Sequence, residues 1–243
     1  MKKVSIITTT YNDSANLKKT IRQIEAQDYE NIEYIIVDGA SKDDTLEVIA
    51  DAKKRFGDRL IWISEKDSGI YDAINKGLRL ATGDFIGLCF DQFAAPDVIS
   101  KMVAIMEKEG TDGVHGDLDY VDGEKIVRKW RQGQGNIRAG WMPGHPTLYL
   151  RKEVYETYGL YKTDYRISAD YEYMIRILKD GNVKLSYIPE VLVKMAHGGT
   201  STNGLGAYLE GLKEGHRALK ENGVKFAFVT DLLRILRVLR QFV

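Results

Sequence analysis

The feature that most constrains the fold is a regular alternation of two kinds of segment along the first ninety residues. Apolar runs rich in β-branched residues predict buried strands at 4–10, 32–37, 60–64 and 85–90. Between them, apolar residues recur at helical spacing over 14–24, 44–55 and 70–81. Strands that alternate with helices through short connections build parallel sheets. We therefore expect an α/β fold with a mostly parallel central sheet and helices on both faces.

The loops that follow these four strands give the first indication of function. In open α/β sheets, ligands bind beyond the carboxyl ends of the strands. Each of these loops contains at least one polar or acidic side chain, at 8–14, 38–45, 65–72 and 91–96. The sequence therefore predicts a ligand site along this edge of the sheet.

Beyond Pro96 the pattern is less regular. We expect a helix over 97–109, short strands at 113–121 and 125–130, and an irregular loop at 133–146. A strand with a short helix, a helix and a closing strand region are expected at 147–161, 169–180 and 183–195. No repeat or linker composition interrupts the chain, so we expect one domain over 1–212 and a helical tail over 213–243.

The tail has the pattern of a basic amphipathic helix. Residues 213–243 carry seven basic against three acidic side chains, and Arg234, Arg237 and Arg240 share one side of a helical wheel. Such a helix lies on anionic membrane surfaces, so residues 224–243 are a candidate peripheral membrane contact. The alternative is a helix that packs on its own domain or in a dimer contact.

Composition excludes several classes of protein. The 35 basic residues balance the 35 acidic ones, so nothing predicts nucleic-acid binding. A single cysteine, Cys89, excludes an internal disulfide framework and a cysteine-based zinc site. Too few apolar residues precede Tyr11 for a signal peptide, so we expect a cytoplasmic protein, with the tail as a candidate contact to the inner face of the plasma membrane.

Familiar nucleotide and hydrolase signatures are absent from the sequence. It contains no P-loop and no G-x-G-x-x-G after the first strand, which removes the main support for P-loop and dinucleotide-binding proteins. It also contains no H-E-x-x-H and no G-x-S-x-G. A nucleotidyltransferase is disfavoured as well, because no glycine- and arginine-rich phosphate loop follows the first strand.

Residues at the first three strand ends can bind a nucleotide. Tyr11 offers a flat face for a base, and the Asp38 carboxylate can accept from a base N–H. The alternative is that Tyr11 packs against its neighbours and Asp38 caps the following helix. Asp67 can accept hydrogen bonds from ribose or sugar hydroxyls, and Gly69 lets the backbone approach a ligand.

Four motifs in order carry a family resemblance. They are V-S-I-I-T-T-T-Y-N from residue 4, I-I-V-D-G-A-S-K-D-D-T from residue 35, D-S-G-I-Y-D-A-I-N-K-G from residue 67 and A-T-G-D-F-I from residue 81. Over roughly residues 3–200 the chain resembles the family-2 glycosyltransferases, inverting enzymes with the GT-A fold that use a nucleotide sugar. The resemblance implies a donor, commonly UDP-linked, bound by Thr8, Tyr11, Asp38, Asp67, Gly69, Asn75, Phe90 and Asp91.

The resemblance also implies a divalent cation, Mn²⁺ or Mg²⁺, held by a D-x-D-like pair beside the diphosphate. Counting back from Pro96 places Asp91 on the second aspartate of the pair and Phe90 on the first, so one carboxylate is missing. Phosphate and water oxygens can complete the coordination around Asp91. The departure leaves a second interpretation open, a non-catalytic or partner-dependent nucleotide-sugar-binding protein. A G-G-x-S-like segment follows His197, which is a candidate additional metal ligand.

Asp170 is the candidate catalytic residue. An inverting transfer needs a general base for the acceptor hydroxyl, and the family's base opens a late helix, at the position of Asp170. The alternative is an acid favoured by the helix dipole. Glu172 is a competing candidate, and we place Glu172 and His145 on the acceptor side. The resemblance implies sugar transfer to a hydroxyl of a glycan or lipid-linked acceptor in bacterial polysaccharide or lipopolysaccharide synthesis.

Overall fold

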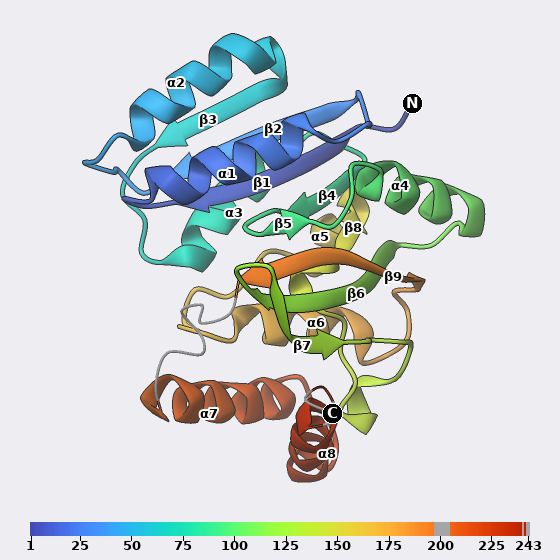
Figure 1. Cartoon of the computed structure of the whole chain (residues 1–243). Coiled ribbons are helices and arrows are strands. Elements are labelled where there is room, and N and C mark those ends of the chain that lie inside the picture. Colours follow the sequence, from blue (N-terminus) through green and yellow to red (C-terminus); the bar gives the residue numbers. More distant parts are fainter. Residues whose placement is uncertain (197–204, 240, 242–243) are drawn as a thin grey trace.

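The computed structural model describes residues 1–196, 205–239 and 241, and its strands in this part of the chain form one mixed sheet (Figure 1). The sheet has the order β3-β2-β1-β4-β8-β6-β9-β5, with β7 paired to β6. The strands are β1 (Val4–Thr10), β2 (Ile32–Asp38), β3 (Leu60–Ser64), β4 (Phe85–Leu88), β5 (Gln92–Phe93), β6 (Gly113–Asp122), β7 (Lys125–Trp130), β8 (Tyr149–Arg151) and β9 (Leu185–Ala196). The expected α/β fold is confirmed.

The four strands expected from the alternation form the parallel part of the sheet, in the order β3-β2-β1-β4. Every residue of β2 is buried, and its side chains alternate between two apolar clusters: Tyr34 and Ile36 belong to one, Ile35 and Val37 to the other. The two clusters therefore lie on opposite faces of the sheet. This double burial explains why the strand sequences read as continuous apolar runs.

Helices cover both faces, as expected (Figure 1). The cluster with Tyr34 receives residues of α1 (Ser14–Glu25), α2 (Thr45–Phe56) and α4 (Val98–Glu109). The cluster with Ile35 receives residues of α3 (Ile70–Leu80), α5 (Lys152–Tyr158) and α6 (Ala169–Leu178). Short 3₁₀ turns occupy Gly57–Arg59, Ile137–Ala139 and His145–Thr147. The last two lie in or at the end of the stretch expected to be irregular.

The second half of the sheet is mixed. β8 pairs antiparallel with both β4 and β6, β6 runs parallel to β9, and β5 and β7 are antiparallel additions. The fourth strand ends at Leu88 rather than at Phe90, because the Thr8 hydroxyl donates to the Cys89 carbonyl at 2.7 Å and the chain turns away there. Phe90 and Asp91 consequently lie in the connection to β5, at the carboxyl edge of the parallel strands.

Two helices close the described chain, α7 (Leu205–Glu221) and α8 (Ala227–Leu239). α7 packs on α6, and α8 packs on α7 and on the turn at Ile137–Ala139 (Figure 1). The boundary expected between residues 212 and 213 falls inside α7. Among the described helices, none combines the length and the hydropathy that crossing a bilayer requires.

Candidate active site

Three strand-end loops meet at the nucleotide side of the expected site. Tyr11 follows β1 and is 63% exposed, so its ring is available to a ligand. Gly39 follows β2, and a Cβ placed there would lie 2.8 Å from Asp67 Oδ2 and 3.2 Å from Tyr11 Cδ2. The loop after β3 is held by the Gly69 N–H, which donates to Asp67 Oδ1 at 3.0 Å. The fold thus brings Tyr11, Gly39, Asp67 and Gly69 together.

Asp38 lies beneath this surface. Its side chain is fully buried and accepts hydrogen bonds from the Ser64 hydroxyl at 2.6 Å, the Ser41 N–H at 3.0 Å and the Ser41 hydroxyl. These bonds tie the ends of β2 and β3 to the turn before α2. Because the Asp38 side chain is fully buried, a base N–H would reach it only if the residues above it moved, so contact between Asp38 and a base stays a prediction.

Two other expected donor residues make internal contacts. Thr8 is buried, and its hydroxyl also accepts from Tyr34 Oη at 3.2 Å. The Asn75 amide donates to the Tyr161 carbonyl at 2.8 Å and accepts from the Tyr161 N–H at 3.0 Å, which fastens α3 to the chain before α6. Both side chains therefore support the walls of the site. Contact between these side chains and a donor stays a prediction.

Asp91 lies at the edge of the sheet beside the end of β9. Burial raises the pKa of the Asp91 carboxyl to about 6, and a hydrogen bond from the Ala196 backbone opposes this shift. A raised carboxyl pKa means that the charged form lacks solvation. The neighbouring Phe90 packs against the apolar cluster that contains Tyr71. An aspartate at position 90 would need a partner in that apolar contact.

Asp91 can contribute one carboxylate ligand to a cation that a substrate also holds. Within the described ranges, no group of three His, Cys, Asp or Glu side chains converges to hold a metal. A poorly solvated carboxylate at Asp91 gains from a cation, and Mg²⁺ is commonly held by one or two carboxylates together with substrate phosphates. The candidate ligand His197 lies outside the described residues.

Asp170 begins the first turn of α6. Its Oδ1 accepts from the Tyr171 N–H at 2.8 Å and lies 3.3 Å from the Tyr71 hydroxyl, which donates to the Ile167 carbonyl at 2.5 Å. None of the described contacts involves Oδ2 of Asp170. One carboxylate oxygen is thus anchored, and the other is left for a ligand.

Glu214 of α7 holds the chain just before Asp170. Its carboxylate accepts from the backbone N–H groups of Arg166 at 2.7 Å, Ile167 at 2.9 Å and Ser168 at 2.8 Å. Ser168, the N-cap of α6, makes no side-chain capping bond of its own. A residue from the expected tail therefore positions the loop that carries the candidate base.

Tyr120 of β6 connects the two halves of the site. Burial raises the pKa of its hydroxyl, Arg128 opposes this, and the charges of Asp91 and Asp170 each raise the pKa further. Arg128 lies over the Tyr120 ring at 4.5 Å and donates to Gln241 Oε1 at 2.8 Å. Tyr120 and Arg128 were not predicted from the sequence, because the hairpin β6–β7 carries no motif. Their only signal is an aromatic and a basic residue on paired strands.

His145 faces the same region from the other side. Its Nε2 lies 2.8 Å from the Tyr161 hydroxyl, and the Tyr161 ring stacks on Tyr71 with centroids 6.1 Å apart. Burial lowers the pKa of His145, and the charge of Asp170 opposes that shift. His145, Tyr161, Tyr71 and Asp170 thus form a continuous polar and aromatic wall.

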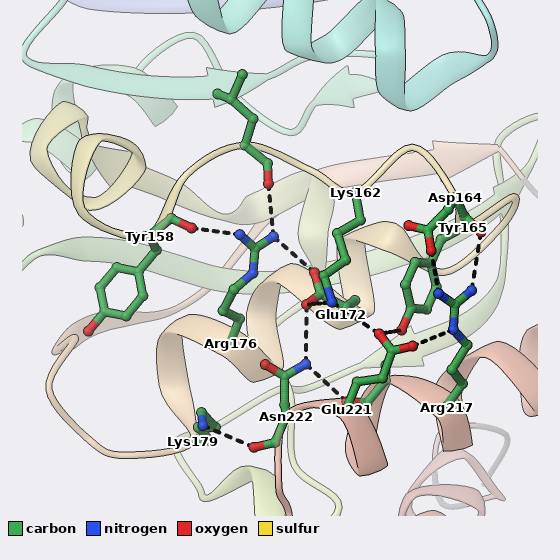
Figure 2. Close-up of polar contacts among 12 residues, drawn as sticks. Tyr158, Lys162, Asp164, Tyr165, Glu172, Arg176, Lys179, Arg217, Glu221 and Asn222 are labelled. Atoms are coloured by element: carbon green, nitrogen blue, oxygen red, sulfur yellow. Dashed lines mark hydrogen bonds and ion pairs between the residues drawn. The ribbon is translucent and has the colours of Figure 1, made fainter.

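Glu172 belongs to a different structure, a buried ion-pair network (Figure 2). Its side chain is fully buried and pairs with Lys162 at 3.2 Å and Arg176 at 2.9 Å. Lys162 also pairs with Glu221 at 3.0 Å, and Asn222 Nδ2 donates to Glu172 at 3.2 Å. The network fastens the end of α7 to α6, and a contact between Glu172 and an acceptor stays a prediction.

Known proteins resemble this chain in sequence and in fold. A PGL/p-HBAD biosynthesis glycosyltransferase of Mycobacterium bovis (strain BCG / Pasteur 1173P2) is 29% identical over 208 residues, covering 82% of this chain and 78% of the relative. The 1–349 fragment of TarS from S. aureus, also solved with UDP-GlcNAc, superposes with a TM-score of 0.72 at 14% identity, covering 97% of this chain and 71% of that fragment.

A second solved structure shares this fold. The mannosyltransferase PcManGT from Pyrobaculum calidifontis, in complex with GDP-Man and Mn²⁺, has a TM-score of 0.71 at 19% identity and covers 97% of this chain and 71% of its own. The expected GT-A architecture is confirmed. The model of the family described as Glycosyl transferase family 2 matches residues 5–179, more than half of the sequence. The chain therefore belongs to glycosyl transferase family 2.

Proposed function

We propose that this glycosyltransferase moves a sugar from a UDP-linked donor to an acceptor hydroxyl with inversion, using Asp91 beside the diphosphate and Asp170 as general base. The observation that carries the proposal is that the loops after β1, β2 and β3 bring Tyr11, Gly39 and Asp67 together at the edge of the sheet where Asp91 follows β4. Asp170, from a distant part of the sequence, lies near enough to Tyr120 of β6 for its charge, like that of Asp91, to raise the pKa of that hydroxyl.

The donor would lie across the loops after β1, β2 and β3. The exposed face of Tyr11 would stack on the base, and Asp67 would accept from ribose or sugar hydroxyls. Gly39 leaves room for the donor between these residues, since a Cβ there would lie 2.8 Å from Asp67 Oδ2 and 3.2 Å from Tyr11 Cδ2. The UDP-GlcNAc and GDP-Man complexes of the two structural neighbours support a nucleotide sugar as the donor.

Asp91 would hold the divalent cation together with the diphosphate. When bound, the cation neutralises the charge that develops on the departing nucleotide. The neighbouring Phe90 packs against an apolar cluster and offers no second carboxylate to that cation. The Mn²⁺ in the mannosyltransferase neighbour supports the choice of metal.

Asp170 would take the acceptor proton. The Tyr171 N–H holds Oδ1, and the Tyr71 hydroxyl lies 3.3 Å from the same oxygen, so that Oδ2 is presented to the acceptor. A positioned base of this kind contributes roughly 10²–10⁴-fold to rate. The proton moves from the acceptor hydroxyl to Oδ2 as the acceptor oxygen bonds to the anomeric carbon of the sugar. The bond from that carbon to the diphosphate oxygen breaks, and the nucleoside diphosphate leaves.

The acceptor would belong to a bacterial cell-surface glycan or glycolipid. The name of the mycobacterial relative, a PGL/p-HBAD biosynthesis enzyme, supports this class. The exposed apolar side chains of α8, which include Phe228, Leu232 and Leu236, support a peripheral contact with the inner face of the plasma membrane.

Calorimetry of UDP with and without Mn²⁺, followed by donor turnover, tests the proposal. Asp91→Asn should abolish the gain in affinity from Mn²⁺. Asp170→Asn should bind UDP normally and lose at least a hundredfold in turnover, roughly the lower end of a general base's contribution. Asp180→Asn, just beyond the other end of α6, is the matched control. Unchanged turnover in Asp170→Asn, or a product with retained anomeric configuration, would refute the assigned mechanism.

The replacement of an aspartate by Phe90 favours one rival function, a nucleotide-sugar-binding protein that does not transfer sugar. Its signature in the same experiment is UDP binding that is independent of Mn²⁺, with neither transfer nor hydrolysis of any UDP-sugar tested.

A further inference from the structure

A groove of about 340 Å³ opens beside the candidate base, between the start of α6 and the helices α7 and α8. Its volume falls within the ~300–1,000 Å³ range of small-molecule sites. Six of its lining residues are Ile167, Asp170, Tyr208, Leu212, Val238 and Leu239. None of the lining residues belongs to the loops after β1, β2 and β3. A donor bound across those loops would therefore leave the groove unoccupied.

The groove is polar at one end and apolar along its walls. Asp170 and Ser168 lie at the α6 end, and Asp170 Oδ2 has no partner among the described contacts. Arg234, the one basic side chain among the described lining residues, pairs with Asp231 at 3.3 Å and lies over the Tyr171 ring at 4.4 Å. Its charge is therefore already balanced, and the walls offer few groups to hydrogen-bond a glycan.

The apolar wall continues onto the surface of α8. Leu239 lines the groove and is 59% exposed, and Leu236, Leu232 and Phe228 follow it at helical spacing on the exposed side. No described residue covers this stripe. An exposed apolar surface of this kind marks an interaction site, and here it runs directly into the groove that ends at Asp170.

We infer that the groove binds the apolar aglycone of the acceptor, with the reacting hydroxyl at Asp170 and the apolar chain directed along α8. The inference rests on the proposed function and names its acceptor class, an alcohol or glycoside that carries a lipid-like group. Asp170 at one end of the groove matches the hydroxyl of such a molecule, and the apolar wall beyond it matches the lipid-like group. The groove thus selects for the aglycone, while the nucleotide side selects the donor.

Two glycines of α7 allow a matched test. A Cβ on Gly211 would meet only Ile167 Cγ2 and Ser168 Oγ, both at 3.9 Å, so Gly211→Leu can fill the groove from α7. Gly206 lies on the same helix, a Cβ placed there would meet nothing within 4 Å, and the residue does not line the groove. Gly206→Leu is therefore the control, and Val238→Phe fills the groove from α8.

The experiment measures binding of methyl, hexyl and octyl β-glucosides to the full chain by calorimetry, below the micellar concentration. We expect affinity to rise with chain length, by up to about fourfold for each fully buried methylene. Gly211→Leu and Val238→Phe should weaken octyl glucoside binding at least tenfold, and Gly206→Leu should leave it unchanged. Tm values show whether each variant is folded.

Equal octyl glucoside binding by the wild type and both groove-filling variants would overturn the inference, because the probe would then bind elsewhere. A dimer that dissociates as octyl glucoside is added would also overturn it, by identifying a second copy of the chain as the occupant. Titration of UDP into the same samples separates the two proposals. UDP binding without octyl glucoside binding refutes only the groove, and the reverse result refutes only the nucleotide-sugar donor.

Discussion

Glu214 provides the sharpest test of how the carboxyl-terminal helices contribute to catalysis. Its carboxylate accepts three backbone hydrogen bonds, at 2.7, 2.9 and 2.8 Å, from the segment that leads into α6. Hydrogen bonds to a charged group contribute about 1.5–3 kcal/mol each. Because Arg166 is exposed, part of this is recovered from water in a variant, and we expect Glu214→Ala to lose about 2–4 kcal/mol of unfolding free energy.

The catalytic effect of the same change separates positioning from general destabilisation. The loop at Arg166–Ser168 includes the Ile167 carbonyl that holds Tyr71, and through Tyr71 the loop also fixes Asp170. Displacement of this wall by about 1 Å can lower kcat on the order of 100-fold. The KM for the donor should be unchanged, since Tyr11 and Asp67 lie on other loops.

The assay compares urea unfolding and steady-state kinetics for three variants. Glu214→Gln keeps an accepting oxygen and should recover part of both losses. Glu210→Ala removes an exposed carboxylate one turn earlier on α7, whose contact is Arg166 at 3.5 Å, and should change stability by less than about 1 kcal/mol. The reasoning is refuted if Glu214→Ala behaves like Glu210→Ala, or if it loses stability while kcat stays at the wild-type value.

Other parts of the structure lead to three more predictions. Gly39→Ala should weaken UDP binding at least tenfold in calorimetry, because its Cβ would lie 2.8 Å from a carboxylate oxygen, whereas Gly206→Ala should not. Burial lowers the pKa of His115 to about 4. As the pH falls, His115 is therefore protonated in the unfolded chain before it is protonated in the folded one. From pH 6.5 down to pH 4, the unfolding free energy of the wild type should fall by about 3 kcal/mol more than that of His115→Gln. Urea unfolding at a series of pH values measures this difference. Glu172→Ala leaves the Arg176 guanidinium without its buried partner and should lower stability by about 3–5 kcal/mol, and a loss below about 1 kcal/mol would contradict the network.

The sequence was sufficient to predict most of the strands and helices and the parallel half of the sheet. Strands that are buried on both faces are apolar throughout, whereas the helices between them bury only one face. These two patterns of apolar residues can therefore be recognised without any information on long-range contacts. The order of the motifs along 4–91 then identified the family, which the match over residues 5–179 confirms. The residues at the loop tips, Tyr11 and Asp67, were found because each follows a recognisable strand.

Only the tertiary structure decided what the polar side chains contact. Asp38 is bound by Ser64 and Asn75 by Tyr161, partners that no local pattern connects to them. Tyr120, Glu214 and the apolar groove were not predicted, because each depends on elements distant in sequence packing side by side. Periodicity reports which face of an element is buried, but the partner on that face is set by the path of the whole chain. The alternation of strands and helices is thus a property of the sequence, and the contact of α7 with the segment that leads into α6 is a property of the fold.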